Sequence, residues 1–137
     1  RMAADLDLVR RLGSAEGGLA VVATPRGDGS VQASVVSAGV LGDPPRVGFV
    51  VRGNARKLVL FRRSGRACVV FRSGWEWVAV EGPVEIVGPD GPEVAQLIRD
   101  VFIAAGGTHD NWLEFDRVMA EEHRTVVLVE PARITSN

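Results

Sequence analysis

The sequence predicts a mainly β or α+β protein, in which a small antiparallel barrel carries short helices on its outside. Valine dominates the apolar residues of a chain that is 46% hydrophobic, and β-branched side chains suit the pleated surface of a sheet. Several segments alternate apolar and polar residues and are joined by turn signals, a pattern typical of hairpins. Closing such a sheet removes its exposed edges. No linker or repeat divides the chain, so we expect one domain over residues 1–137.

The N-terminal segment predicts a helix followed by a strand. Residues 5–15 place Leu6, Val9 and Leu12 at helical spacing, and Gly13 stands near the end. The apolar run 19–24 then predicts a buried strand.

A hairpin follows directly. Asp28-Gly29 readily takes the positive φ of a tight turn. Residues 30–41 then alternate, so the two faces of the second strand are distinct. One face carries Gln32, Ser34 and Val36, and the other carries Val31, Ala33 and Val35.

The middle of the chain predicts a strand, a helix and two further strands. After Pro44-Pro45 we expect a strand at 46–52, then a helix at 54–64 that Asn54 caps. Strands at 67–71 and 76–87 follow, joined by a turn at Ser73-Gly74.

The C-terminal part predicts two helices and a last strand. Apolar residues at i, i+3 and i+4 spacing indicate a helix at 93–105, which Gly106-Gly107 ends. A helix at 110–122 carries Trp112, and a strand at 125–130 is closed by Pro131.

Composition excludes several functional classes. The formal net charge is −1, which argues against general nucleic-acid binding because that needs a basic surface. No apolar run approaches the roughly 18–20 residues that span a bilayer, and the first residues lack the apolar stretch of a signal peptide. The one cysteine, Cys68, fits a reducing compartment. We therefore expect a cytoplasmic protein.

Standard catalytic motifs are missing. The sequence has no GxSxG elbow, Walker loop or GxGxxG motif after a strand. Cys68 lies in an apolar strand, where a buried inert thiol is expected over a nucleophile. His109 and His123 have no carboxylate or cysteine at metal-ligand spacing, so surface or capping roles are expected and no metal site is predicted.

The segment 50–58 is a candidate anion site. A strand ends there, a Gly-Asn turn follows, and a helix begins with Arg56 and Lys57 in its first turn, with Arg52 just before it. Free N–H groups and cationic side chains at such a junction suit a phosphate or carboxylate. The alternative is a solvated basic helix face that continues through Arg62, Arg63 and Arg66.

Two tryptophans near a turn form a second candidate site. Trp75 and Trp77 have the same strand parity, so they lie on one face. Their indoles could line a planar ligand or bury into a partner subunit, and ordinary core packing is the alternative.

The order of these segments resembles the pyridoxamine 5′-phosphate oxidase-like split-barrel family, and within it the F420-dependent oxidoreductase branch. The resemblance covers nearly the whole chain and rests on an ordered set of short segments. They are the hairpin at 23–34, Arg56-Lys57, the segment 62–67, Gly74-Trp75, Ala79-Val80-Glu81-Gly82, and a tail from Gly107-Thr108-His109-Asp110-Asn111-Trp112 through Met119 to Arg124-Thr125-Val126-Val127.

This resemblance implies an FMN-binding split barrel that forms a homodimer with cofactor sites between the subunits. It implies that Arg56 and Lys57, with Arg52 beside them, hold the cofactor phosphate. The ring would then lie near Gln32 and Ser34. Trp75 would stand near the ring pocket, and the helix with Trp112 would help to close it.

The sequence departs from the family pattern at two places. Leu60 stands where the family often has an asparagine after the junction lysine, so contact details differ. The chain ends at Asn137 without the C-terminal arginine–histidine segment of true pyridoxamine phosphate oxidases, so vitamin B6 oxidation is not expected.

Three functions remain open on the sequence. The first is an F420-dependent reductase that transfers a hydride to a small unsaturated substrate such as an enone or quinone. The second is an FMN-dependent oxidoreductase on the same fold. The third is a non-catalytic protein that binds F420, flavin, haem or a fatty acid. In the first two, the cofactor supplies the redox chemistry and the protein positions the substrate.

Overall fold

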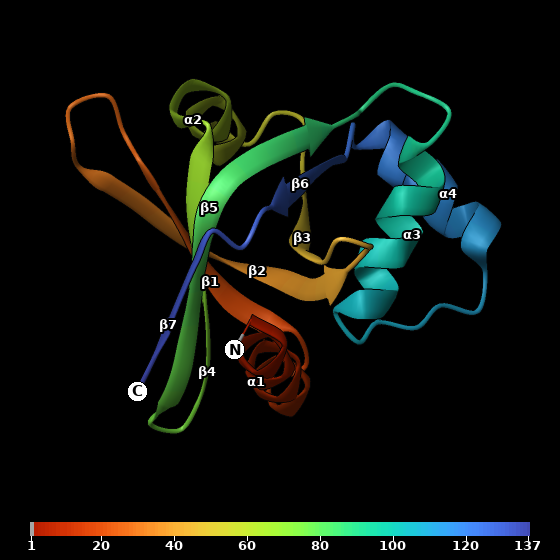
Figure 1. The fold of residues 1–137 in the computed structure, drawn as a ribbon. Coiled ribbons are helices and arrows are strands. Elements are labelled where there is room, and N and C mark those ends of the chain that lie inside the picture. The colour runs from red at the N-terminus through yellow and green to blue at the C-terminus, as the bar shows by residue number, and fades with distance from the viewer. Residues whose placement is uncertain (1) are drawn as a thin grey trace.

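Six antiparallel strands close into a barrel in the computed structural model, which describes residues 2–137 (Figure 1). The strand order is β4–β1–β2–β3–β6–β5, and β5 pairs again with β4. The strand bounds are β1 Leu19–Pro25, β2 Val31–Leu41, β3 Arg46–Val51, β4 Arg66–Ser73, β5 Glu76–Val87 and β6 Thr125–Val129. The predicted fold class, a small antiparallel barrel with flanking helices, is confirmed.

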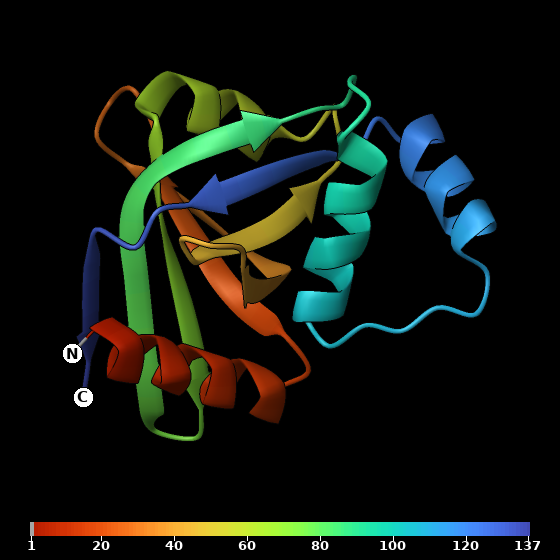
Figure 2. The same ribbon diagram turned by 45° about the vertical axis from the view of Figure 1, so that its right-hand side comes forward.

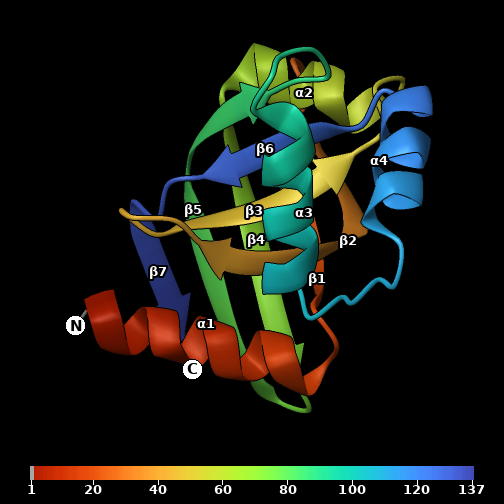
Figure 3. The same cartoon turned by 90° about the vertical axis from the view of Figure 1, so that its right-hand side faces the viewer.

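Four helices lie around the barrel, and their bounds are α1 Met2–Ala15, α2 Arg56–Ser64, α3 Val94–Ala104 and α4 Trp112–Glu121. Helices α1 and α2 lie at opposite ends of the barrel (Figure 2). Helix α3 packs across β2, β3 and β6, and α4 lies beside α3 (Figure 3). Within residues 2–137, no helix is both long and apolar enough to cross a membrane.

The hydrophobic core has two parts. The larger part fills the barrel, and Phe49, Phe61 and Phe71 are among its largest side chains. The smaller part lies between the barrel wall and the helices α3 and α4. Strand β6 contributes side chains to both parts of the core, so all of its residues are buried. A strand that is buried on both faces is typically a continuous apolar run without alternation.

The structure adds a seventh strand that the sequence analysis missed. After β6 the chain passes Pro131 and pairs once more with β5 as β7, Arg133–Ser136. Proline has no N–H and interrupts the ladder, but the N–H of Ala132 already donates to Glu81 O at 3.0 Å. The predicted strand end at Pro131 is therefore only an interruption, because β6 and β7 pair one after the other with the same strand, β5.

The predicted cap of the second helix is wrong. Helix α2 has Ala55, not Asn54, at its N-cap, and no side chain donates or accepts a capping bond there. The Ala55 N–H instead donates to Arg52 O at 3.0 Å, so a turn of the backbone starts the helix. Asn111 does cap α4, because its side chain accepts from the Glu114 N–H at 3.1 Å.

Position 39 on β2 requires glycine, because the C-terminal end of α3 packs directly against the backbone there. A Cβ at this position would overlap the backbone carbonyl of Ala104, which cannot move without shifting the helix. We predict that Gly39→Ala lowers the free energy of unfolding by about 1–3 kcal/mol, the usual cost of overpacking. Urea denaturation measures it.

Gly13 provides the matched control. It lies inside α1, and its added Cβ would make ordinary contact with the Phe71 ring at 3.5 Å. Alanine is favoured over glycine in a helix by about 1 kcal/mol, so Gly13→Ala should leave stability unchanged or raise it. Equal losses for the two variants would contradict the close packing of α3 on β2.

Candidate functional site

A hollow of about 490 Å³ lies between the barrel strands β2 and β3 and the helices α3 and α4. Apolar side chains make most of its wall, and three cationic side chains stand in the same lining. These cations are Arg52, Lys57 and Arg124. A largely apolar cavity with a few converging polar groups is the usual form of a small-molecule site.

Lys57 is the half-buried cation of this hollow. Its Nζ donates to Ser34 Oγ at 3.0 Å, which joins the first turn of α2 to the inward face of β2. Burial lowers the pKa of Lys57, and the positive charge of Arg124 lowers this pKa further. Its position in the first turn of α2 adds to this cost, because the helix dipole disfavours a cation there.

Glu122 connects the two arginines. Its Oε2 accepts from Arg52 Nη2 at 2.7 Å, and its Oε1 accepts from Arg124 Nε at 2.9 Å. The side chains of Glu122 and Arg124 are about three-quarters buried, whereas Arg52 is more exposed. Both carboxylate oxygens are thereby engaged with arginine.

A close backbone approach brings these segments together. Val51 at the end of β3 pairs with Thr125 at the start of β6, so the two chain junctions are neighbours. A Cβ on Gly53 would lie 2.7 Å from the carbonyl oxygen of His123, and His123 has a positive φ of 51°. Glycine at 53 therefore permits the β3–α2 junction to rest against the turn between α4 and β6.

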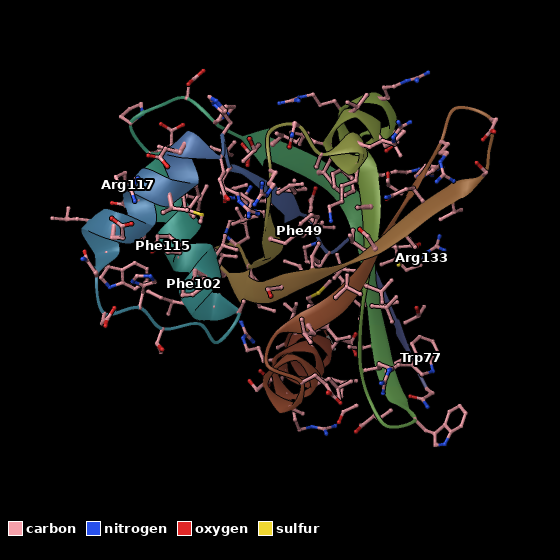
Figure 4. The ribbon with its side chains drawn as sticks, turned by 180° about the vertical axis from the view of Figure 1, so that it is seen from behind. Phe49, Trp77, Phe102, Phe115, Arg117 and Arg133 are labelled. Atoms are coloured by element: carbon pink, nitrogen blue, oxygen red, sulfur yellow. The ribbon has the colours of Figure 1, made fainter. Side chains whose placement is uncertain are left out.

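The apolar wall comes from α3 and α4. Phe102, Phe115 and Met119 line the hollow, and the rings of Phe102 and Phe115 are in tilted contact, with centroids 5.0 Å apart (Figure 4). Trp112 packs edge-on against both rings at 6.1 and 5.2 Å. These ring contacts join α3 and α4 beside the hollow.

An ion pair and a histidine complete this aromatic cluster. Arg99 lies over the Trp112 ring at 5.3 Å and donates to both carboxylate oxygens of Asp116, at 2.9 and 2.6 Å. The His109 ring is in tilted contact with the same indole, with centroids 5.9 Å apart, and its Nδ1 accepts from the Asn111 N–H at 3.0 Å. Within residues 2–137, no cluster of His, Cys, Asp or Glu could hold a metal ion.

The predicted site residues divide into those that meet at the hollow and those that do not. Lys57, Arg52 and Ser34 meet at its polar end. Arg56 lies elsewhere, in a second hollow beneath the β1–β2 turn with Arg26 and Arg63. Trp112 stands behind the rings that line the wall.

Gln32 and Trp75 lie outside the lining of the hollow that contains Lys57. Gln32 faces the same way as Ser34 on β2, and its buried Oε1 has no hydrogen-bond partner among the described residues. Trp75 sits in the β4–β5 turn and is 94% exposed, and Trp77 on β5 is also exposed. Core packing of these two indoles, the alternative considered from the sequence, is therefore wrong.

Cys68 does not belong to the site. It is half-buried on the outer face of β4, and burial together with the charge of Glu81 raises the pKa of its thiol. A raised pKa keeps the thiol protonated and weakly nucleophilic.

The sequence analysis missed Arg124, Phe102, Phe115 and Met119 as lining residues. The helical spacing of the three apolar residues indicated a buried face, but not that this face borders a hollow. Arg124 carried no local signal, because only the pairing of β3 with β6 brings it beside Lys57.

One outer face of the barrel carries exposed apolar side chains, and no helix of residues 2–137 covers it. Figure 4 shows Trp77 and Arg133 on the side of the barrel away from Phe102 and Phe115. Exposed apolar side chains on β1, β2 and β5 share this outer apolar face, and they are Leu19, Val21, Val31, Val35 and Trp77. Val35 also lines the hollow, so the face and the hollow adjoin.

Comparison with solved structures places this architecture among split barrels. A conserved hypothetical protein from Mycobacterium tuberculosis is 20% identical, with a TM-score of 0.74 over 99% of this chain and 83% of that one. A pyridoxamine 5′-phosphate oxidase-related, FMN-binding protein from Nostoc punctiforme is 13% identical, with a TM-score of 0.66 over 99% and 82%. An F420 reductase is 18% identical, with a TM-score of 0.63 over 85% and 88%.

No protein-family model and no curated protein matches the chain. The similar structures include several pyridoxamine 5′-phosphate oxidase-like proteins. The chain therefore has the split-barrel fold of these proteins, as the resemblance implied.

The electrostatics of the hollow can be tested on a single side chain, since Lys57 is the one lysine of the sequence. We predict that Arg124→Gln raises the pKa of Lys57, because removing a like charge favours the ammonium form. Titration of the ¹⁵Nζ signal of lysine-labelled protein measures the shift. Arg62→Gln, at the exposed end of the same helix, is the control. An unchanged pKa in Arg124→Gln would mean that burial alone lowers it.

Proposed function

We propose that the protein is an F420-dependent oxidoreductase, a reductase that transfers a hydride from the reduced deazaflavin to a small unsaturated substrate such as an enone or quinone. One observation carries the proposal. The hollow joins a half-buried lysine at its polar end to an aromatic wall at its apolar end. This is the combination that a phosphate-bearing planar ring requires, and an F420 reductase shares the fold.

The residues present fit such a cofactor. A volume of about 490 Å³ lies within the usual range for small-ligand sites. Lys57 and Arg124 supply cations for a phosphate, and the apolar strand and helix side chains supply a wall for a ring.

Each of these residues has a physical role in the proposal. Lys57 binds the phosphate, and Ser34 orients the lysine by accepting its hydrogen bond. Phe102 and Phe115 exclude water from the reacting carbon, which protects a hydride donor from side reactions. The bound deazaflavin supplies the hydride, and the protein supplies orientation.

Protonation of the substrate draws on solvent in this scheme. No carboxylate or histidine stands among the described residues that line the hollow. An enone or quinone suits this site, because its protonation after hydride transfer needs no strong acid within the protein.

An FMN-dependent activity is the second candidate. It is favoured by the FMN-binding protein from Nostoc punctiforme, whose fold matches as much of this chain as any structure reported above. FMN also carries a phosphate and a tricyclic ring, so the hollow alone does not select between the two cofactors.

We propose that a second copy of this chain covers the outer apolar face. An exposed face of this kind is a common mark of an interaction surface. Val35 belongs to both the face and the hollow, so a copy bound there would border the cofactor site. The exposed Trp75 and Trp77 would then contact the partner subunit.

Titration of the apo protein with F420 and FMN side by side tests the cofactor assignment. We expect F420 to bind with quenching of its fluorescence and, once reduced, to be oxidised when an enone or quinone is added. Lys57→Ala should weaken binding by about 1.5–3 kcal/mol, the scale of a charge-assisted hydrogen bond. Preferred binding of FMN, with a yellow purified protein, would support the second candidate. Tight binding without turnover on a broad panel of substrates would indicate a carrier.

Sedimentation velocity tests the second copy. We expect a dimer for the wild type and a monomer for Val21→Glu, because a buried carboxylate in the middle of an apolar interface is costly. Val21 is 41% exposed on β1. Val59→Glu is the matched control, since Val59 is 54% exposed on α2 and lies outside the face. A wild-type monomer at micromolar concentration would overturn the proposal.

A further inference from the structure

Two cations share the hollow without a carboxylate between them. Lys57 donates to the neutral hydroxyl of Ser34 and forms no ion pair with any described residue. Arg124 donates from Nε to Glu122, and no described residue accepts a hydrogen bond from its Nη groups. Glu122 is already divided between Arg124 and Arg52.

This arrangement costs free energy in the empty protein. Lys57 is half-buried and Arg124 is about three-quarters buried, and like charges repel more strongly where the effective dielectric constant is low. Buried charges normally occur with an opposite charge beside them. An oxyanion placed between the ammonium and the guanidinium would remove the repulsion and satisfy donors on both sides.

We propose that Lys57 and Arg124 together form the anion-binding pair of this hollow, and that the ligand group they hold is a phosphate. The inference rests on the proposed function for the identity of the phosphate, which is that of the cofactor. A phosphate is favoured over a carboxylate, because its several oxygens can accept from an ammonium and from the planar guanidinium at once.

Glu122 is the positioning residue of the pair. It does not touch the phosphate, but its Oε1 holds Arg124 through Nε at 2.9 Å and leaves the Nη groups for the ligand. Its Oε2 holds Arg52 at 2.7 Å. The turn that carries Glu122 is fixed against Gly53, whose N–H donates to the Glu122 backbone carbonyl at 3.4 Å.

The arrangement revises the role that the local sequence suggested for Arg56. Arg56 precedes Lys57 directly but lines the other hollow, under the β1–β2 turn. In this proposal, the second cation for the phosphate is Arg124, directly before β6, and not the neighbouring residue in α2.

Dissociation constants of F420 and FMN for the wild type, Lys57→Ala, Arg124→Gln and the double variant test the pair. We expect each single change to weaken the preferred cofactor about 10-fold or more, as for a charge-assisted hydrogen bond. The double variant should lose less than the product of the two factors, because both side chains hold one group. Arg62→Gln, outside the hollow, should stay within about twofold. A loss of less than twofold in Arg124→Gln would overturn the pair.

The role of Glu122 has its own readout. Glu122→Gln should weaken cofactor binding in the wild type but add nothing when Arg124 is already glutamine. A merely structural role would weaken binding by the same factor in both backgrounds, and that result would overturn the assignment.

A titration with inorganic phosphate and pyrophosphate separates this inference from the proposed function. In the wild type, the ¹⁵Nζ signal of Lys57 should shift on addition of either anion, and the shift should be lost in Arg124→Gln. If this holds while neither F420 nor FMN binds, the anion pair stands and the cofactor assignment fails. If a cofactor binds but its affinity is independent of Arg124, the cofactor assignment stands and the pair fails. No response to any of these ligands would overturn both.

Discussion

Closure of the barrel depends on one long strand, β5, which pairs with two different partners along its length. Its first half pairs with β4, from Glu76 to Pro83, and its second half pairs with β6, from Val84 to Val87. Between the halves, Gly82 lies so close to the carbonyl of Glu130 that a Cβ would overlap that carbonyl. A side chain at this point would force β6 away from β5 and open the barrel.

The position of β6 in turn determines the site. Because β6 pairs with β5 on one side and with β3 on the other, its first residue lies beside the last residue of β3. The two junctions that carry Lys57 and Arg124 are thereby held side by side, although they are far apart in the sequence. Lys57 lies in the first turn of helix α2, and Arg124 lies directly before β6, where Glu122 accepts a hydrogen bond from its Nε. These contacts hold both cations in place in the absence of a ligand.

The fold could be predicted from the sequence to a large extent, because its signals are local. Alternation in β2, the Asp28-Gly29 turn and the apolar spacing in α3 each act over a few residues, and each predicted the element that is present. The predictions that failed were those of a strand end and of a helix cap, where a tertiary contact or a backbone turn overrides the local sequence preference. Pro131 interrupts a ladder that tertiary pairing resumes, and the turn before α2 makes Asn54 unnecessary as a cap.

The candidate site could be predicted only in part, for a related reason. Lys57 and Arg52 stand at a chain junction that the sequence marks by itself, whereas Arg124 becomes a neighbour only through strand pairing. For the two tryptophans, by contrast, the sequence suggested a buried or ligand-binding role that the structure does not show. Large indoles near a turn suggest a core or a ligand wall, but here the β4–β5 turn carries Trp75 out into solvent.

The choice of lysine at position 57 follows from this geometry in a chain whose other basic residues are all arginine. The position is half-buried, lines the same hollow as Arg124, and offers one hydroxyl acceptor, Ser34 Oγ. A lysine ammonium is a compact charge on a flexible stem, and burial changes its protonation readily. A second guanidinium would bring five donors and a permanent charge against Arg124, with too few acceptors to satisfy them. On the proposed function, lysine therefore supplies a cation for the cofactor phosphate at a smaller electrostatic cost in the empty hollow than a second arginine would.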